Sequence, residues 1–345
     1  MKITEHIGLD IGTNEVKAVY LTPEGDKFKL VAFGSVATPA GGSASENLAD
    51  QQKLADNIRQ LLRDAGINSR RAVIALPESQ VFTRVIETPF LTDTELDSAI
   101  NWEAEQYVPV PLSDVLLRHQ ILTTPEKNDP NGKMTVLIVA APNTVINRYM
   151  KIIELAGLEL GGIETEILAI SRALMFNDPA SPPTLIINLG AATTDISVVN
   201  KGILSFARSL PTGGDAVTRA MSTDLNLDPV QAEEYKRAYG LDKSKLDGKV
   251  FNSIKTVIDI ITAEVKKGLV YYQTKQPDDV VRRVVLSGGM AQMPGLVDFL
   301  AQGLTMEVQV GNSLAGLSKT EQQARALLES APLYTVAVGL ALKQI

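Results

Sequence analysis

The chain contains no cysteine, only two histidines and no long apolar segment. Without cysteine, a disulfide framework and a thiol-ligated metal or iron–sulfur site are excluded. His6 and His119 alone make a His-based metal cluster or a Ser–His–Asp triad a poor expectation. No apolar run approaches the ~20 residues that span a bilayer, and residues 1–5 lack the apolar core of a signal peptide. These absences are compatible with a cytoplasmic protein.

Composition also bounds the size and charge of the protein. At 345 residues the chain exceeds the usual ceiling for one hydrophobic core, so we expect two lobes. A hydrophobic content of 45% supports a well-buried core. The net charge of −7, with acidic and basic residues interspersed, argues against nucleic acid as the main partner and leaves no polybasic patch for a membrane surface.

Three glycine-centred turns, each after an apolar run, carry the main functional signal. The first turn contains Gly12, Thr13 and Asn14 and predicts a tight hairpin. Its glycine lets the backbone approach a phosphate, and its exposed N–H groups form an anion-binding concavity. Lys17 adds a point charge suited to phosphate, and Asp10 adds a carboxylate for magnesium and its waters. Taken alone, these residues also fit an ordinary hairpin.

The second turn repeats this arrangement about half a chain later. It begins after Asn188 and contains Gly190, Ala191 and Thr193. Gly190 allows close backbone approach, Thr193 supplies a hydroxyl, and Asp195 supplies a second carboxylate on the magnesium side. Two similar hairpins suggest two similar halves that close on a nucleotide, with a phosphate-binding turn from each half.

The third turn, which contains Gly288, Gly289 and Met290, follows a buried-strand pattern near the C-terminus. Two glycines at the end of a strand leave bare backbone against which a flat base or ribose can lie. A fourth and fainter turn carries Gly213 and Gly214 at the start of a predicted helix, where it can face a phosphate or ribose. Either turn alone is a weak signal, because αβ units contain such loops routinely.

In this order the turns resemble those of the actin-like ATPase superfamily, which includes actin, Hsp70 and sugar kinases. The resemblance covers nearly the whole chain. It implies an α/β fold of two lobes with duplicated ribonuclease-H-like cores, each with a five-stranded sheet, around a cleft for ATP and Mg²⁺. Residues 8–17 and 188–195 resemble the phosphate loops, and 286–297 the adenosine loop. Residues 163–174 and 331–343 resemble the two helices that connect the lobes.

The resemblance also implies roles for acidic residues. Asp10 and Asp195 match residues that lie near the magnesium ion, mostly through water. Glu164 matches the position at which relatives place a Glu or Gln that orients the attacking water. Glu166 is a nearby competitor for this role.

Several residues depart from the family pattern. Asn188 stands where relatives usually have an aspartate, and a neutral amide cannot serve magnesium as a carboxylate does. Ala192, like its neighbour in the second turn, replaces a glycine of many relatives. These changes predict weak or absent ATPase activity more than lost ATP binding. Glu264 and Lys267 resemble nucleoside contacts, but the next polar residue is replaced by Gly268, and a solvated i,i+3 ion pair explains them equally well.

Within the superfamily the chain resembles the PilM family of type IV pilus assembly, through its length and segments 75–77 and 100–109. The second segment resembles the end of a helix in that family's inserted small subdomain. Trp102 and Tyr107 in this helix would either form part of a peptide-binding face or pack in the subdomain core. The expected organisation is a first-lobe core at 1–77, the inserted subdomain at 78–145, the remainder of the first lobe with a connecting helix at 146–180, the second lobe at 181–330 and a C-terminal helix returning to the first lobe at 331–345.

Periodicity and capping patterns place the remaining elements. Thr92, with Glu95 three residues later, predicts a capping box at the start of the inserted helix. We expect strands near 115–122, 134–141, 185–188, 195–200 and 203–208, and helices near 48–65, 214–225, 229–239 and 249–275.

The leading functional hypothesis is a nucleotide-loaded adaptor of type IV pilus assembly or of a related type II secretion system. By resemblance, it would capture the cytoplasmic N-terminal tail of a PilN-like inner-membrane protein and be recruited through it to the inner face of the membrane. Other pilus assembly components and self-association are further interactions that the resemblance implies.

Two alternatives remain open from the sequence. A filament-forming cell-division protein of the FtsA type normally carries a C-terminal membrane-targeting helix, which we do not expect here. A sugar-kinase-like phosphotransferase needs an aspartate base and a sugar pocket between the lobes, and no such base can be named.

Overall fold

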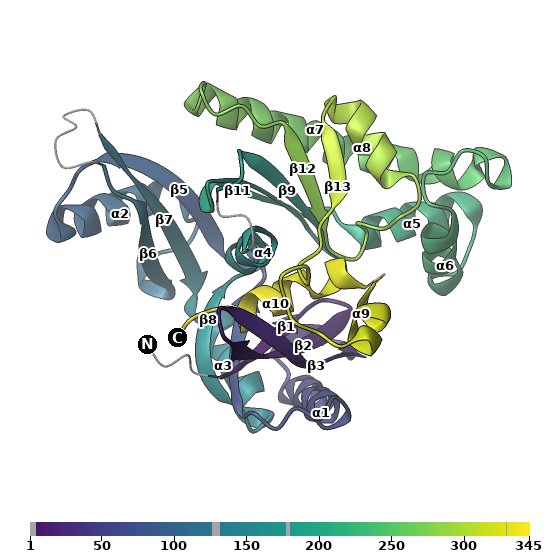
Figure 1. Ribbon diagram of the computed structural model, residues 1–345, viewed down its shortest axis with the longest axis horizontal. Coiled ribbons are helices and arrows are strands. Elements are labelled where there is room, and N and C mark those ends of the chain that lie inside the picture. The colour runs from purple at the N-terminus through teal and green to yellow at the C-terminus, as the bar shows by residue number, and fades with distance from the viewer. Residues whose placement is uncertain (1–4, 126–131, 177–179, 329) are drawn as a thin grey trace.

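The computed structural model describes residues 5–125, 132–176, 180–328 and 330–345. Three β-sheets organise these residues: one five-stranded sheet in each of two lobes, and a three-stranded sheet in a subdomain that projects to one side (Figure 1). Helices α4 (Glu166–Met175) and α10 (Thr335–Ala341) lie between the lobes. The two-lobe α/β architecture expected from the sequence is confirmed.

The first lobe is built on a sheet with strand order β3-β2-β1-β4-β8. Its strands are β1 (Ile7–Ile11), β2 (Glu15–Glu24), β3 (Lys27–Ala37), β4 (Arg71–Leu76) and β8 (Glu159–Thr165). The first three form an antiparallel meander, and β4 and β8 continue the sheet in parallel. Helices α1 (Leu48–Asp64) and α3 (Asn143–Leu155) bury Leu54, Ile58 and Tyr149 in the core beside this sheet.

The second lobe repeats this topology, with strand order β11-β10-β9-β12-β13. Its strands are β9 (Thr184–Leu189), β10 (Thr194–Asn200), β11 (Ile203–Leu210), β12 (Arg283–Ser287) and β13 (Glu307–Val310). Again three antiparallel strands are followed by two parallel ones. The helices of this lobe are α5 (Gly214–Leu225), α6 (Pro229–Tyr239), α7 (Lys249–Lys275) and α8 (Leu296–Leu304). Helix α9 (Glu321–Leu327) follows β13 in the chain but packs on β2 and β3 of the first lobe. The expected pair of similar halves is therefore present.

The projecting subdomain contains β5 (Phe82–Pro89), β6 (Val115–Thr123), β7 (Lys133–Pro142) and α2 (Asp93–Tyr107). Its strand order is β5-β7-β6, so β5 and β6 are edge strands. Leu96 and Ile100 of α2 pack on Val136 and Ile138 of β7. The predicted capping box of Thr92 and Glu95 is confirmed at the start of α2. Among the described residues, no helix has both the length and the apolarity to cross a membrane.

The two helices between the lobes touch each other closely at a glycine. A Cβ on Gly339 of α10 would lie 1.9 Å from the carbonyl oxygen of Ala169 in α4, so only glycine permits this crossing. On its other side α10 meets β1, where a Cβ on Gly8 would lie 2.0 Å from the carbonyl oxygen of Ala337.

Both connecting helices begin later than the sequence predicted. Strand β8 continues to Thr165, because that residue still pairs with Leu76 of β4, so α4 begins at Glu166 instead of near residue 163. The segment Ala331–Tyr334 forms a 3₁₀ turn before α10.

Candidate nucleotide site

The second and fourth turns form a single packed unit. The backbone N–H of Gly214 donates to the carbonyl oxygen of Gly190, and that of Asp215 donates to Ala191, both at 2.9 Å. A Cβ on Gly213 would lie 2.6 Å from the Ala191 carbonyl oxygen, so the turns can approach this closely only with glycine. Thr193 lies half-buried beside these turns. Its carbonyl oxygen accepts from the backbone N–H of Gly190 at 2.9 Å, which closes the second turn.

The third turn packs against the same unit. Gly288 has φ of 85°, a left-handed conformation that favours glycine, and a Cβ there would lie 2.5 Å from the carbonyl oxygen of Leu189. The Met290 backbone N–H donates to that same oxygen at 3.3 Å, and its side chain lies beside Gly214. Gly289 is exposed. The second, third and fourth turns thus pack together on one side of the region where the lobes meet.

The first turn belongs to the other lobe and faces these three turns. The backbone N–H of Gly12 donates to the Glu15 carbonyl oxygen at 3.1 Å, which closes the hairpin and leaves Thr13 and Asn14 exposed. The Asn14 side-chain amide donates to the Asp215 carboxylate at 3.0 Å. This contact brings the first turn against the fourth, so all four turns meet where the two lobes face each other, and we call this region the cleft.

Asp10 and Asp195 are both buried at this cleft. Burial raises the pKa of Asp10, although the ammonium of Lys17, 4.0 Å away, acts in the opposite direction. Burial likewise raises the pKa of Asp195 to about 6, against hydrogen bonds from Ser209 at 2.6 Å and Asn188 at 3.2 Å. The Asn188 amide therefore serves as a donor to Asp195.

Two further carboxyls, the half-buried Glu166 and the buried Glu78, belong to the same electrostatic cluster. Burial raises the pKa of Glu166 well above its ordinary value, and the charges of Asp195 and Asp10 raise it further. Burial and the charge of Asp195 raise the pKa of Glu78 to about 7. Glu78 was missed at the sequence level, because it belongs to no motif and precedes an exposed-looking segment.

Glu164 does not join this cluster. Its two carboxylate oxygens accept hydrogen bonds from Arg172 at 2.6 and 2.8 Å, and Lys343 donates to it at 2.7 Å. Arg172 also donates to the Gly339 carbonyl oxygen, so these ion pairs join α4 to the C-terminal segment. The Glu164 carboxylate is thus held in ion pairs with Arg172 and Lys343, and the water-orienting role expected for it stays a prediction.

The two residues expected to contact the nucleoside, Glu264 and Lys267, pair with each other. Glu264 accepts from Arg208 of β11 and from Lys267, each at 2.6 Å, so the i,i+3 pair proposed as an alternative is present. Lys236 of α6 lies at the turns instead: its buried ammonium donates to the Gly214 carbonyl oxygen at 3.2 Å and pairs with Glu233 at 2.5 Å. Glu233 and Lys236 have the same Glu-x-x-Lys spacing as Glu264 and Lys267, in the second helix after the fourth turn. This spacing could have identified the pair from the sequence.

These residues fit a magnesium nucleotide. Several buried carboxyls face the cleft, and Lys17 is the ammonium recorded beside Asp10. Within the described part of the chain, no three His or acidic side chains are close enough to bind a metal ion directly. A cation here would be held mainly through water and phosphate oxygens, which is the coordination that Mg²⁺ favours.

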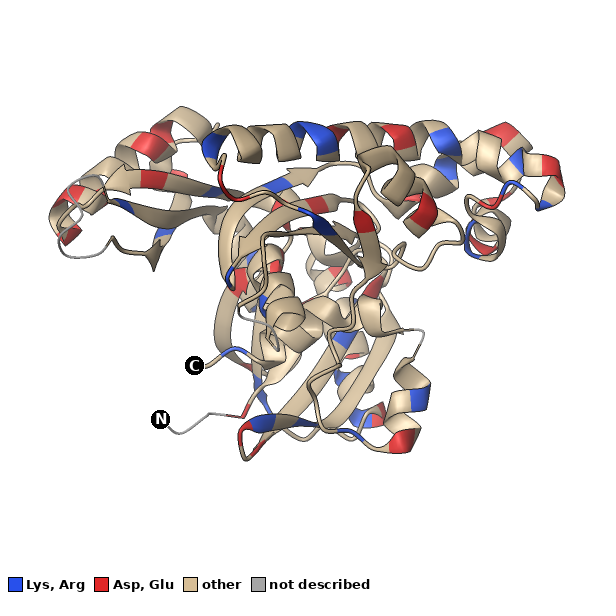
Figure 2. Cartoon of the chain, turned by 45° about the horizontal axis from the view of Figure 1, so that its top comes forward, with Lys and Arg blue, Asp and Glu red and all other residues tan. Residues whose placement is uncertain are grey.

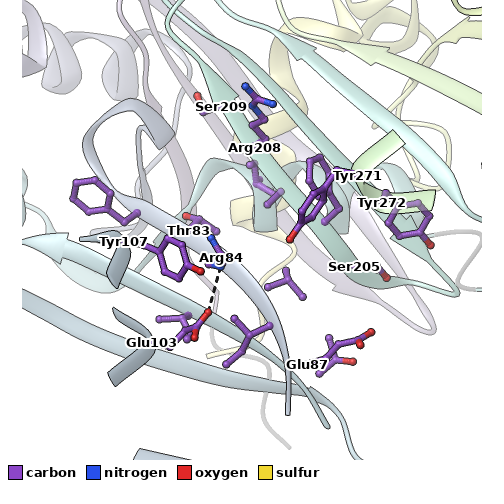
Figure 3. Close-up of a pocket in the computed structure, with 18 of the residues that line it drawn as sticks. Thr83, Arg84, Glu87, Glu103, Tyr107, Ser205, Arg208, Ser209, Tyr271 and Tyr272 are labelled. Carbon is purple, nitrogen blue, oxygen red and sulfur yellow. Dashed lines mark ion pairs between the residues drawn. The ribbon is translucent and has the colours of Figure 1, made fainter. Parts of the chain in front are cut away.

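A cavity of about 770 Å³ lies between the projecting subdomain and the second lobe (Figure 3). One wall is residues 82–87 of β5, and the opposite wall is residues 205–209 of β11. Both are edge strands of their sheets. We call this cavity the inter-strand groove.

Aromatic and charged residues line the inter-strand groove. On one side, the Arg84 guanidinium lies 3.5 Å from the centroid of the Tyr107 ring and 3.6 Å from Glu103. On the other, Tyr271 and Tyr272 of α7 face the groove. Charges of both signs occur on α7 and are interspersed over both lobes (Figure 2).

Trp102 does not pack in the core of the projecting subdomain, which was one of the two expectations. Its exposure is 65%, and that of Tyr107 is 46%. The buried face of α2 is formed by Leu96, Ile100 and Ala104 instead.

Comparison with known proteins identifies the family. A sequence model of the family described as type IV pilus assembly protein PilM matches residues 8–345. The chain belongs to the PilM family. Among solved structures, the PilM–PilN type IV pilus biogenesis complex is similar, with a TM-score of 0.86 and 27% identity over 98% of each chain.

Other relatives are more distant from this PilM-family chain. The cell division protein FtsA of Neisseria meningitidis is 24% identical over 96% of this chain and 88% of that protein. FtsA of Bacillus subtilis is 24% identical over 89% of this chain and 78% of that protein. MreB 5 of Spiroplasma citri, solved bound to AMPPNP, has a TM-score of 0.54 with 14% identity over 98% and 95% of the two chains, which supports the actin-like ATPase fold.

Proposed function

We propose that the protein is an ATP-binding adaptor of type IV pilus assembly. Its family is that of a pilus assembly protein, and a similar structure was solved in complex with PilN. The observation that carries ATP binding is the meeting of four glycine turns beside buried carboxyls, with the lobes in contact through Asn14 and Asp215.

In this proposal the turns bind the phosphates, and Asp10 and Asp195 hold the waters of a magnesium ion. Lys17 offsets the charge of Asp10 and approaches the phosphates. Lys236 and Glu233, beneath Gly214, take the nucleoside-side role first assigned to Glu264 and Lys267. The bound cation would neutralise carboxyls whose burial otherwise disfavours their charged form.

Hydrolysis would be slow. Glu166 is the acidic residue that faces the metal-side carboxyls, and we assign to it the water-orienting role first given to Glu164. Asn188 already donates to Asp195, so one carboxylate that would help to position magnesium is missing. Loss of such positioning commonly costs orders of magnitude in rate.

The partner would be the cytoplasmic N-terminal tail of a PilN-like protein, which would recruit the adaptor to the inner face of the membrane. The inter-strand groove supports this proposal, because an extended peptide can add its backbone to an exposed strand edge. Here an edge of β5 and an edge of β11 face the same groove. Six residues of β5 line it, which corresponds to about 20 Å of extended chain.

Titration calorimetry of the full chain tests the proposed ATP binding. ATP with Mg²⁺ should bind the wild type, and Asp10→Ala and Lys17→Ala should weaken binding. A wild type that gives no ATP heat, indistinguishable from both variants, would contradict the nucleotide proposal.

A synthetic peptide of the N-terminal tail of PilN from the same organism tests the groove. Tyr107→Ala and Tyr271→Ala should weaken its binding and leave ATP affinity unchanged. Trp102→Ala, on the same helix as Tyr107, and Tyr235→Ala, an exposed tyrosine of α6, are matched controls outside the groove. Crosslinks that place the peptide wholly on the second lobe would refute a site shared with the inserted subdomain.

The FtsA relatives favour a second candidate, a filament-forming protein. It predicts ATP-dependent polymers of the full chain without PilN. Electron microscopy of the ATP-loaded protein distinguishes the two: filaments support the FtsA-like alternative, and their absence with retained peptide binding supports the adaptor.

A further inference from the structure

Glu78 lies where the projecting subdomain leaves the first lobe, between β4 and β5, and only 5% of it is exposed. One carboxylate oxygen accepts from the backbone N–H of Ile167, in the first turn of α4, at 3.2 Å. The other accepts from the Thr83 hydroxyl, at the start of β5, at 2.8 Å. One side chain therefore joins the helix between the lobes to an edge strand of the inter-strand groove.

Glu78 also lies next to the acidic cluster, because its partner Ile167 directly follows Glu166 in α4. The charge of Asp195 is, after burial, the second cause of its raised pKa. In return, the backbone N–H of Glu78 lowers the otherwise raised pKa of Glu166. Among the described residues, no Lys, Arg or His forms an ion pair with Glu78, so local charge in the cleft acts on it without a competing cation.

The same residue forms part of the wall of the groove. Glu78, Thr83 and Ile167 all line the cavity, and the 3₁₀ turn Glu78–Gln80 contacts both β5 and β11. A change in how firmly Glu78 holds Thr83 is therefore a change in the first residues of the groove edge.

We propose that Glu78 is a positioning residue that couples the occupied nucleotide cleft to the inter-strand groove. A divalent cation near Asp10 and Asp195 offsets the negative charge that faces Glu78, which strengthens its charge-assisted hydrogen bonds to Ile167 and Thr83. These bonds order the start of β5. The inference rests on the proposed ATP site and adds the regulation of the groove.

Amide hydrogen exchange of the full chain tests this coupling without the partner. Saturating ATP with Mg²⁺ should slow exchange in residues 82–89 of the wild type by about fivefold, the lower end of usual coupling between sites. Glu78→Gln keeps both hydrogen bonds, since its amide can donate to Thr83, but loses the charge. Thr83→Val keeps the charge but loses the bond. Both should abolish most of the slowing.

Glu105→Gln is the matched control, since it makes the same change at an exposed position of α2 in the same subdomain, outside the lining of the groove. It should respond to ATP like the wild type. ATP affinity is measured by calorimetry in each variant. If the wild type binds no ATP, the nucleotide proposal and the coupling are both overturned. If it binds ATP but exchange of β5 does not change, or if Glu78→Gln keeps the wild-type response, the coupling alone is overturned.

Discussion

The side-chain amide of Asn14 and the carboxylate of Asp215 form a 3.0 Å hydrogen bond across 201 residues of sequence, between the first turn of one lobe and the fourth turn of the other. Asp215 lies in the first turn of α5, where the helix N-terminus stabilises its negative charge. The bond therefore holds the lobes together at the place where we expect phosphates to bind.

This contact predicts opposite effects for two substitutions. Asn14→Ala should loosen the closed arrangement and weaken ATP·Mg²⁺ binding about threefold, because one exposed hydrogen bond to a charged group is lost. Asp215→Asn keeps an amide acceptor and removes a negative charge near the phosphates, so its affinity should equal or exceed that of the wild type. Calorimetry measures both, and a weaker Asp215→Asn would argue against phosphates at this turn.

Substitution of Glu166 should change the rate of ATP hydrolysis, whereas substitution of Glu164 should change the stability of the fold. Glu166→Gln should lower steady-state phosphate release at least tenfold without a loss of stability, because it removes a half-buried carboxylate that acts on Asp10 and Asp195. Glu164→Gln should instead lower the free energy of unfolding by about 3 kcal/mol, since Arg172 and Lys343 lose a buried anion. Phosphate-release assays and thermal scans separate the two. Equal rates in Glu166→Gln and wild type would remove Glu166 from the mechanism.

Asn188→Asp should raise phosphate release in the presence of magnesium and destabilise the nucleotide-free protein. The new carboxylate would lie within contact of Asp195, where the amide now donates at 3.2 Å, and two like charges would repel. Magnesium and ATP should restore the lost Tm. An unchanged rate would show that Asn188 does not explain slow hydrolysis.

Stability without nucleotide should fall as pH rises from about 4 to about 7. The pKa values of Asp195 and Glu78 are raised from 3.8 to about 6 and from 4.5 to about 7. The folded protein then binds protons that the unfolded chain has released, so stability is fully present below the unfolded pKa and is lost through the folded pKa. Glu233, with its pKa lowered to about 2, titrates below this window.

Thermal scans at several pH values check this expectation. The Tm should decline between about pH 4 and about pH 7, and Glu78→Gln should remove part of the decline. ATP with Mg²⁺ should flatten the profile. A Tm that rises over this interval would contradict the assigned shifts.

The sequence predicted the turns well because glycine has a steric reason to be at each of them. Gly213 and Gly288 meet backbone oxygens that no side chain could tolerate. The helices at 214–225 and 249–275 were also correct, since their capping and apolar periodicity are local.

The role of Glu164 depended on information that is not local. Whether Glu164 or Glu166 faces the cleft depends on where β8 ends, and that is decided by pairing of Thr165 with Leu76. The role of Glu78 could not be predicted from the sequence, because its partners Thr83 and Ile167 come together only when the projecting subdomain meets α4.

The glycine contacts that place α10 between β1 and α4 also set an order of events during synthesis. Strand β1 ends at Ile11 and α10 begins at Thr335, so at about 5–20 residues per second the ribosome makes α10 roughly 15 to 65 s after β1. All five strands of the second-lobe sheet lie within 184–310 and can pair before then. The first lobe is therefore the last to complete its core, and until then the surface of β1 that α10 covers stays without this helix.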